Sequence, residues 1–380
     1  MKKIIVITPW FYPAYKAGGP IQSISNLISA IDNALSFSVI TSAYDLRETV
    51  ALTGIKVDEW VVLDCKGEGE EVPIWYGKRL TKSVFFKSLK EQEPTVVYIN
   101  GMFSYRFVIL PLLATDKSKI KVVLCPRGML QRGALAGKSF KKKLYLSALK
   151  LSGLVKNITW HATNAEEEAD IKKLFGKQAK IIIAANIPKQ PVINMELPTK
   201  KPGKLRLIYL SLIAEKKNLL QVIELINKSA ANITLDIYGP VKDAAYWKKC
   251  ELAIADSSGK VKYMDDIRPE LVQDTFAKYD ASILLTKGEN FGHALYESLS
   301  TGRPIITSYF TPWNELEQKR AGWNLDIADN DACLKILESI CKMDNEPFNA
   351  YCNGAYEMAK LYYRESSDLS SYYAMFGQER

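Results

Sequence analysis

Residues 283–308 read ILLTKGENFGHALYESLSTGRPIITS, and this stretch has the order strand, loop, helix, strand. The apolar runs 283–286 and 305–307 predict two strands, and the periodic segment 293–301 predicts the helix between them. Glycines in the loop 287–292 allow the backbone to approach a ligand closely. The free N–H groups at the start of the following helix favour an anion. The stretch therefore predicts a βαβ unit with an anion-binding loop.

Two carboxylates flank this loop. Glu289 lies between Gly288 and Gly292, and Glu297 follows in the helix. A carboxylate can accept hydrogen bonds from two adjacent ribose hydroxyls, which suits Glu297, and Glu289 is placed as an active-site carboxylate. A solvated loop charge and a favourable helix-dipole charge are the alternatives. Together with the anion-binding loop, the pair predicts a sugar-nucleotide site.

The composition fits two globular domains. A chain of 380 residues is too long for one ordinary core, and 47% hydrophobic with 24% charged residues excludes a disordered protein. No apolar stretch has the length of a membrane span. The apolar run 4–7 is too short for a signal peptide and is followed by Pro9, so we expect a first strand and a cytoplasmic protein.

The net charge of +9 favours anionic partners such as nucleic acid, phosphorylated substrates or acidic lipid headgroups. Lysines cluster at 138–143, which is either a solvated face or a peripheral contact with the inner face of an anionic membrane. Six scattered cysteines without a C-x-x-C pair, and only two histidines, support neither a disulfide framework nor a metal site. We expect no metal and no cofactor.

Strands and helices alternate through both halves, which predicts parallel sheets covered by helices on both faces. Strands are expected at 1–9, 37–41, 61–63, 72–76, 95–99, 121–125, 158–161, 181–183, 205–210, 233–238, 261–264, 281–285 and 305–308. Helices are expected at 21–31, 83–90, 107–114, 140–151, 165–175, 218–228, 244–255 and 293–301, with a helical tail at 347–376. We expect a first domain over 1–186 joined by a C-terminal helix at 362–380, a proline-containing linker over 187–204, and a second domain over 205–361.

Further candidates follow predicted strands. Lys216 and Lys217, after the first strand of the second half, could reach a phosphate, or Asn218 could simply cap a surface helix. Gly18 and Gly19 follow the first strand of the chain, but they do not form a dinucleotide fingerprint and could be a simple turn.

Two residues at strand ends of the first half are also candidates. The fork of Arg127 suits a phosphate or carboxylate, or a surface ion pair. His161 could contact phosphate or acceptor, although a histidine at a strand end is more often a satisfied core residue.

With these residues in place, the chain resembles glycosyltransferase family 4, the retaining group 1 glycosyl transferases. Residues 289–297 match the family's E-x₇-E motif, and 298–304 fit its continuation. Further segments that resemble the family are 215–219, 237–240, 311–313 and 322–323 in the second half, and 18–20, 100–104 and 126–130 in the first.

The resemblance implies an α/β GT-B fold, in which two Rossmann-like, doubly wound parallel-sheet domains face a central cleft. It implies transfer of a sugar from a nucleoside-diphosphate sugar to a glycan or lipid-linked acceptor, with retention, in assembly of a surface polysaccharide such as capsule, exopolysaccharide or lipopolysaccharide. No metal and no nucleic acid would take part.

The resemblance also assigns roles. Glu289, with the backbone N–H groups of Asn290, Phe291 and Gly292, would face the transferred sugar, and Glu297 would hold the ribose. The following residues would complete the site: Lys217 and Lys216 on the diphosphate, Gly18 and Gly19 near the phosphates, and Asn100 near the transferred sugar.

The chain departs from the family at two positions. Leu212 stands where an arginine is usual, and Asn100 stands where a histidine is frequent. Two other functions therefore stay open, a GT-B epimerase acting on the nucleotide sugar and a non-catalytic glycan- or nucleic-acid-binding protein.

Overall fold

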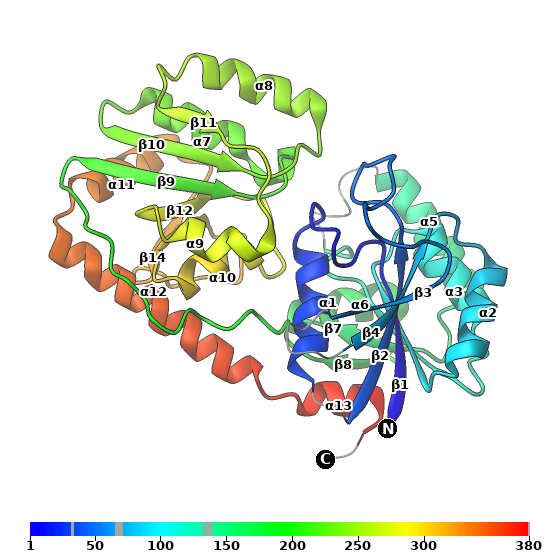
Figure 1. The fold of residues 1–380 in the computed structure, drawn as a ribbon. Helices are drawn as coiled ribbons and strands as arrows, with labels where there is room; N and C mark the ends of the chain where they lie inside the picture. The colour runs from blue at the N-terminus through cyan, green and yellow to red at the C-terminus, as the bar shows by residue number, and fades with distance from the viewer. Residues whose placement is uncertain (32–33, 65–70, 132–134, 136–138, 379–380) are drawn as a thin grey trace. The chain divides into compact units, whose positions relative to one another are not determined.

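The computed structural model describes residues 1–31, 34–64, 71–131, 135 and 139–378. The chain folds into two compact units, and each is an α/β domain (Figure 1). Unit 1 comprises Met1–Ile187 and Ser366–Arg380, and unit 2 comprises Pro188–Glu365.

Unit 1 is built on an eight-stranded sheet in the order β3-β4-β2-β1-β5-β6-β7-β8. Its strands are β1 (Lys2–Ile7), β2 (Leu35–Ser42), β3 (Trp60–Asp64), β4 (Glu71–Gly77), β5 (Val96–Asn100), β6 (Lys121–Cys125), β7 (Thr159–Ala162) and β8 (Lys180–Ile183). All neighbours are parallel except β3, which pairs with β4 in antiparallel register and forms one edge. The expected parallel sheet is thus present, with one antiparallel strand added at its margin.

Helices cover both faces of this sheet. They are α1 (Gly19–Ala30), α2 (Lys82–Gln92), the π-helical turn η1 (Tyr105–Ile109), α3 (Leu110–Ala114), α5 (Ser139–Leu151), α6 (Ala165–Phe175) and α13 (Ser370–Phe376). Alternate residues of β1 point to opposite faces, as the twofold period of a strand requires. Ile4 and Val6 pack in one buried cluster with α1 and α13, and Ile5 and Ile7 pack in another with α2, α3 and α5.

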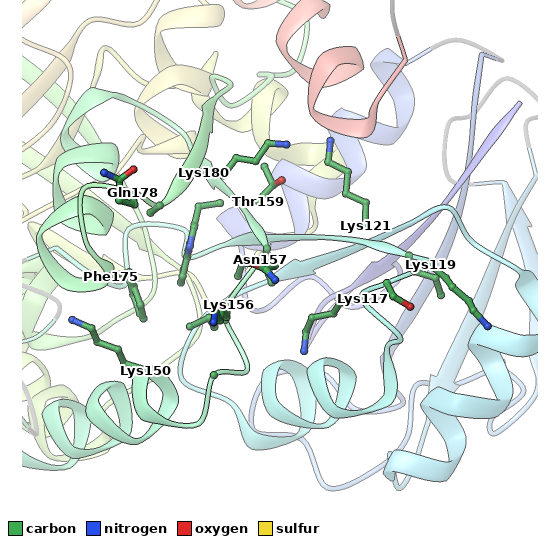
Figure 2. Close-up of a pocket in the computed structure, with 17 residues that line it drawn as sticks. Lys117, Lys119, Lys121, Lys150, Lys156, Asn157, Thr159, Phe175, Gln178 and Lys180 are labelled. Atoms are coloured by element: carbon green, nitrogen blue, oxygen red, sulfur yellow. The ribbon is translucent and has the colours of Figure 1, made fainter.

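A recess opens at the amino-terminal edge of this sheet (Figure 2). It has a volume of about 850 Å³ and lies where β6, β7 and β8 begin. Six lysines line it: Lys117, Lys119, Lys121, Lys150, Lys156 and Lys180.

Unit 2 contains a six-stranded, fully parallel sheet in the order β11-β10-β9-β12-β13-β14. Its strands are β9 (Lys204–Leu210), β10 (Asn232–Tyr238), β11 (Val261–Tyr263), β12 (Ala281–Leu284), β13 (Ile305–Ser308) and β14 (Gly322–Leu325). Its helices are η2 (Glu215–Lys217, 3₁₀), α7 (Leu219–Lys228), α8 (Ala244–Ala255), η3 (Pro269–Leu271, 3₁₀), α9 (Val272–Phe276), α10 (His293–Ser300), α11 (Asn330–Lys342) and α12 (Asn345–Ser366).

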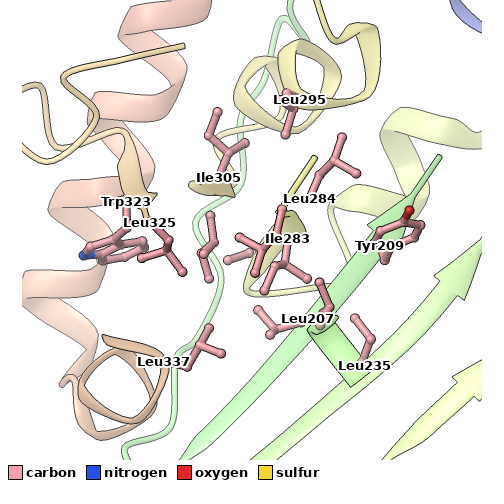
Figure 3. Close-up of a cluster of buried hydrophobic side chains, with 14 of the residues drawn as sticks. Leu207, Tyr209, Leu235, Ile283, Leu284, Leu295, Ile305, Trp323, Leu325 and Leu337 are labelled. Atoms are coloured by element: carbon pink, nitrogen blue, oxygen red, sulfur yellow. The ribbon is translucent and has the colours of Figure 1, made fainter. Parts of the chain in front are cut away.

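The core of unit 2 lies between its sheet and the helices α7, α10, α11 and α12 (Figure 3). Leu207 of β9, Ile283 of β12 and Ile305 of β13 are fully buried there, and Leu295 of α10 packs with them. On the opposite face, Ile208 packs with Phe276 of α9 in a smaller cluster. Because successive strand residues face opposite ways, both faces of these apolar strands are covered.

Several elements differ from expectation, among them the short helices η3 and α9, which were not predicted. The predicted helix at 218–228 is preceded by a 3₁₀ turn, because Asn218 adopts a left-handed conformation with φ 58°. Strand β14 was not predicted, since it is short and begins with glycine. Helix α11 was not predicted either. The tail forms two helices, α12 and α13, rather than one run.

In the part of the chain that the structure describes, no helix is long and apolar enough to cross a membrane. Five cysteines there are free and buried, and Cys65 lies outside the described residues. No cluster of three or more metal-ligating His, Cys, Asp or Glu side chains occurs among the described residues.

Candidate active site

The loop 285–292 connects β12 to α10 and is stabilised by hydrogen bonds within the loop and to Lys216. The hydroxyl of the buried Thr286 lies 3.1 Å from the Gly288 carbonyl oxygen and 3.3 Å from that of Lys216. The backbone N–H of Lys287 donates to the same Lys216 carbonyl at 2.8 Å. The loop after β12 is therefore tied to the turn after β9, the neighbouring strand.

Two glycines of this loop have conformations that other residues rarely adopt. Gly288 has φ 156°, and a Cβ atom there would lie 3.2 Å from Lys216 Cε. Gly292 has φ 80° and precedes the first residue of α10. A Cβ atom at Gly292 would lie 3.1 Å from Glu289 Cγ. The glycines allow the close approach that places Glu289 beside the start of α10.

Phe291 anchors the loop through packing. Its side chain is buried against three aromatic rings, with centroid distances of 5.6 Å to Trp313, 5.9 Å to Tyr296 and 5.3 Å to Tyr362. The indole N–H of Trp313 donates to the Phe291 carbonyl at 2.6 Å. The apolar side chain is thus structural, and only the backbone of Phe291 remains as a candidate ligand contact.

The short turn η2 positions Lys217. The hydroxyl of Tyr209, buried in β9, donates to the Lys217 carbonyl at 3.2 Å. Asn218 does not cap α7 with its side chain, which donates to Gln221 instead. This arrangement removes the capping interpretation of the segment and fixes the backbone of Lys217 at the carboxyl-terminal edge of the sheet.

Lys217 and Glu289 are brought into direct contact. The Lys217 ammonium donates to Glu289 Oε2. Both side chains are partly accessible, at 20% for Lys217 and 17% for Glu289. The two charged residues assigned to the diphosphate and the transferred sugar therefore lie together beside the start of α10.

Glu297 is the fifth residue of α10 and is buried, with 4% exposure. Its backbone carbonyl accepts a hydrogen bond from Ser300 Oγ at 2.8 Å. Lys216 and Asn290 are half-buried beside the loop. All of the candidates in unit 2 thus lie on η2, the loop 285–292 or α10.

In unit 1, Gly18 and Gly19 begin α1 at the carboxyl end of β1. Gly18 has φ 65° and its carbonyl accepts from the N–H of Ile21 at 3.0 Å. The preceding loop is held by Asp45, whose Oδ2 accepts from the N–H of Tyr15 at 2.9 Å. The two glycines therefore mark the N-terminus of a helix, a position that suits an anion.

Arg127 is committed to neighbours in unit 1. Its Nε donates to Asn100 Oδ1 at 3.0 Å, and its two terminal nitrogens donate to Asn186 Oδ1 at 2.5 Å and to the Tyr98 hydroxyl at 2.9 Å. These bonds engage three of the five N–H groups of the guanidinium. The same contact orients Asn100, a buried residue whose Nδ2 has no partner among the described residues.

His161 is fully buried, and both ring nitrogens are engaged. Nδ1 lies 2.7 Å from the Tyr98 hydroxyl and Nε2 lies 2.8 Å from the Ala184 carbonyl oxygen. Burial, together with the positive charge of Arg127, lowers the pKa of His161 to about 3. The placement favours a neutral core histidine and gives no access for phosphate or acceptor.

Sequence reasoning missed the residues that support the candidates. Tyr98 and Asn186 have no local signature, because their partners are distant in the sequence. Trp313 lies in a segment that resembles the family, but its contact with Phe291 was not predicted. The buried carboxylate of Glu167 accepts from the N–H groups of Gly128 at 2.6 Å and Thr163 at 2.8 Å. Only the alternation of Tyr98 within an apolar strand could have suggested that it faces the core.

Two parallel-sheet units, with charged side chains at the carboxyl-terminal edge of the second, define the class of protein. The chain is an α/β protein with the GT-B fold of glycosyltransferases. Residues 194–355 match the family model described as glycosyl transferases group 1. This part of the chain is a group 1 glycosyl transferase domain.

Several solved structures are similar over almost the whole chain. The Anabaena Alr3699/HepE complex with UDP-glucose has a TM-score of 0.70 at 12% identity, covering 98% of this chain and 100% of that one. WaaG, a glycosyltransferase involved in lipopolysaccharide biosynthesis, has 0.68 at 13%, covering 98% and 100%. TarM of S. aureus has 0.70 at 11%, covering 100% of both. At such low identities, the similarity to these structures shows a shared fold only. Comparison with curated protein sequences gives no match.

Proposed function

We propose that the protein is a retaining glycosyltransferase of family 4, acting in surface polysaccharide biosynthesis. It moves a sugar from a nucleoside-diphosphate sugar to a glycan or lipid-linked glycan acceptor. The observation that carries this proposal is the contact between Lys217 and Glu289 beside the start of α10. A cation, a carboxylate and the N-terminus of α10 converge there, at the carboxyl-terminal edge where open α/β sheets bind ligands.

The chemistry requires charge stabilisation more than a nucleophile. As the bond between the sugar C1 and the diphosphate oxygen breaks, negative charge grows on the leaving group. Lys217 and the N–H groups at the start of α10 stabilise that charge. The acceptor oxygen bonds to C1 on the same face, and its proton passes to the leaving phosphate oxygen. Glu289 orients the transferred sugar, and Glu297 holds the ribose. No metal ion is required in this scheme.

The donor proposed first is a UDP-sugar. Its support is the bound UDP-glucose of the Anabaena relative, which has the same fold. The lipopolysaccharide role of WaaG supports a glycan or lipid-linked acceptor in the same indirect way. The assignment therefore needs a direct assay with several bases.

The test is to incubate the protein with UDP-, GDP- and ADP-sugars and to measure donor binding and slow donor hydrolysis. We expect the protein to bind donor sugars that carry one of these three nucleotides, and we expect the Glu297→Ala variant to lose that binding. Absence of binding by all donors, together with an unaffected Glu297→Ala variant, would refute the proposal. Acceptor-independent conversion to an isomeric nucleotide sugar would assign the epimerase function instead.

We also propose that α5 contacts an anionic membrane on the cytoplasmic side. Phe140 and Leu144 on this helix are exposed at 77% and 63%, beside the exposed Lys141 and Lys143. Exposed apolar and basic side chains on one helix favour an anionic interface. Lys138, the first residue of the predicted cluster, lies outside the described residues.

Vesicles of phosphatidylcholine with phosphatidylglycerol test this contact in a flotation assay. We expect the double variant Lys141→Glu/Lys143→Glu to lose vesicle binding, and the control Lys78→Glu/Lys82→Glu to retain it. Unchanged binding of the first variant would dispose of the contact.

A further inference from the structure

The lysine-lined recess of unit 1 is the strongest feature that the transfer reaction does not use. Its lysines come from separate segments: Lys117, Lys119 and Lys121 from the loop before β6 and the start of β6, Lys150 from α5, Lys156 from the loop before β7, and Lys180 from the start of β8. Figure 2 shows these side chains around the recess, on elements that meet at one edge of the sheet. The concentration of positive charge is thus a product of the fold and not of one basic run.

The charge of the recess is largely uncompensated. None of the 17 lining residues is Asp or Glu. Of the six recess lysines, Lys119 alone has an acidic partner within 4 Å among the described residues, Asp116 at 3.9 Å. The Asp116 carboxylate is also engaged by Ser118. Partial burial and the neighbouring Lys180 and Lys2 lower the pKa of Lys121. A bound anion reduces the electrostatic repulsion between like charges that the fold holds together in this way.

The recess is separate from the candidate transfer site. It lies at the amino-terminal ends of β6, β7 and β8, whereas Asn100 is the last residue of β5 and Arg127 follows the carboxyl end of β6. The five residues of β6 separate the two edges by roughly 16 Å, at about 3.3 Å per residue. A nucleotide sugar bound for transfer would therefore not fill the recess.

The lining favours a ligand that stays in water. The uncharged polar residues Asn157, Thr159 and Gln178 accompany the lysines, and they can hydrogen-bond to hydroxyl groups. The lining residues include none of the large apolar side chains that are exposed in unit 1, in contrast to Phe140 and Leu144 on α5. Insertion into lipid needs such side chains, so a hydrated polyanion fits the recess better than a bilayer does.

We propose that this recess is a second binding site, which holds an acidic glycan chain through its carboxylate groups. Lysine ammonium groups are point charges on flexible side chains, so they can pair with carboxylates whose spacing along a polymer is irregular. That the polyanion is a glycan rests on the proposed function; the anion site itself rests on the recess. Such a site would keep an acidic polymer on the enzyme between transfer steps.

The test is calorimetric binding of oligogalacturonate, with fully methyl-esterified oligogalacturonate as an uncharged control. The variant Lys121→Gln/Lys156→Gln/Lys180→Gln removes three charges from the recess. The matched control Lys78→Gln/Lys82→Gln/Lys90→Gln removes three exposed lysines elsewhere in unit 1. We expect the acid form to bind, the ester not to bind, and affinity to fall at least about tenfold in the recess variant only, with weaker binding as salt rises.

Three outcomes would overturn the proposal: no binding of the acid form, equal loss in both variants, or tighter binding of a single-stranded oligonucleotide of equal charge. Vesicle flotation that depends on the recess lysines, without glycan binding, would assign the recess to the membrane. Binding is measured without a nucleotide sugar and repeated in the Glu297→Ala variant. Loss of glycan binding at the recess can therefore be distinguished from loss of donor binding, because each is measured independently of the other.

Discussion

Lys217 and Glu289, 72 positions apart in the sequence, form an ion pair at the carboxyl-terminal edge of the sheet of unit 2. One follows β9 and the other follows β12, which are adjacent parallel strands. The cation proposed for the diphosphate is therefore paired with an internal carboxylate. We therefore expect a donor diphosphate to compete with Glu289 for Lys217, which would leave the carboxylate available to the sugar.

Replacing Lys217 with alanine should weaken UDP binding by about 10- to 150-fold. A hydrogen bond to a charged group contributes about 1.5–3 kcal/mol, and about 1.4 kcal/mol corresponds to a factor of ten. Isothermal titration with UDP measures the change, and Lys335→Ala, on the exposed face of α11, is the control. If the Lys217→Ala variant binds UDP with wild-type affinity, Lys217 is not part of the phosphate site.

Replacing Glu289 with glutamine should separate binding from transfer. Loss of the carboxylate frees Lys217, so UDP should bind roughly two- to fivefold more tightly, as expected for a partly exposed ion pair of at most about 1 kcal/mol. The rate of sugar transfer should fall, because the carboxylate assigned to the sugar is gone. A parallel loss of UDP affinity and transfer rate would contradict the proposed competition.

The role of Glu297 can be tested by comparing the binding of nucleotides with and without the two ribose hydroxyls. The wild-type protein should bind UDP about tenfold or more tightly than 2′,3′-dideoxy-UDP, since a carboxylate accepts from both hydroxyls. In Glu297→Ala the two ligands should bind equally, with UDP weakened to the level of the dideoxy compound. Because Glu297 is buried, the melting temperature of the variant must be compared with the wild type. A preserved preference for UDP in a folded variant would place the ribose elsewhere.

Much of the fold could be predicted because it depends on local patterns. The apolar runs around β1, β9 and β12, and the helical stripe of α1, indicate alternating strands and helices without any tertiary information. The loop 285–292 could also be located, since its glycines and carboxylates are contiguous. Strand β3 was predicted at 61–63, but its antiparallel direction depends on its pairing with β4. The short strand β14 depends on its neighbour β13, and no pattern within it shows this.

The site itself could be predicted only as separate pieces. Sequence position indicates that Lys217 and Glu289 follow strands, but their contact depends on β9 and β12 being adjacent. The same limit applies to Arg127, whose partners Asn100 and Asn186 lie 27 and 59 positions away. Long-range hydrogen bonds decide whether such a charged residue faces a ligand or the protein.

Arg303 should be a stability residue of unit 2. Its buried guanidinium donates to the carbonyls of Tyr279 at 2.9 Å, Ala277 at 2.7 Å and Glu196 at 2.9 Å. Arg303→Met should lower the free energy of unfolding by at least about 2 kcal/mol, because several buried acceptors lose their donors. Scanning calorimetry measures the change, with the exposed Arg364→Met on α12 as the control. Equal stability of the two variants would contradict this role.

His161 should make unit 1 less stable in mild acid. Its pKa is about 3 in the folded chain, against about 6.5 when unfolded, so the unfolded state binds a proton between these values and the folded state does not. This stability is complete above about pH 6.5 and is lost progressively as the pH falls towards 3. From pH 7 to pH 5 the loss from this residue should be about 2 kcal/mol. In His161→Gln, which keeps a polar partner for Tyr98, the dependence of the unfolding free energy on pH should be shallower by that amount. Denaturant unfolding at both pH values measures it, and an unchanged slope in the variant would show that His161 is not the titrating group.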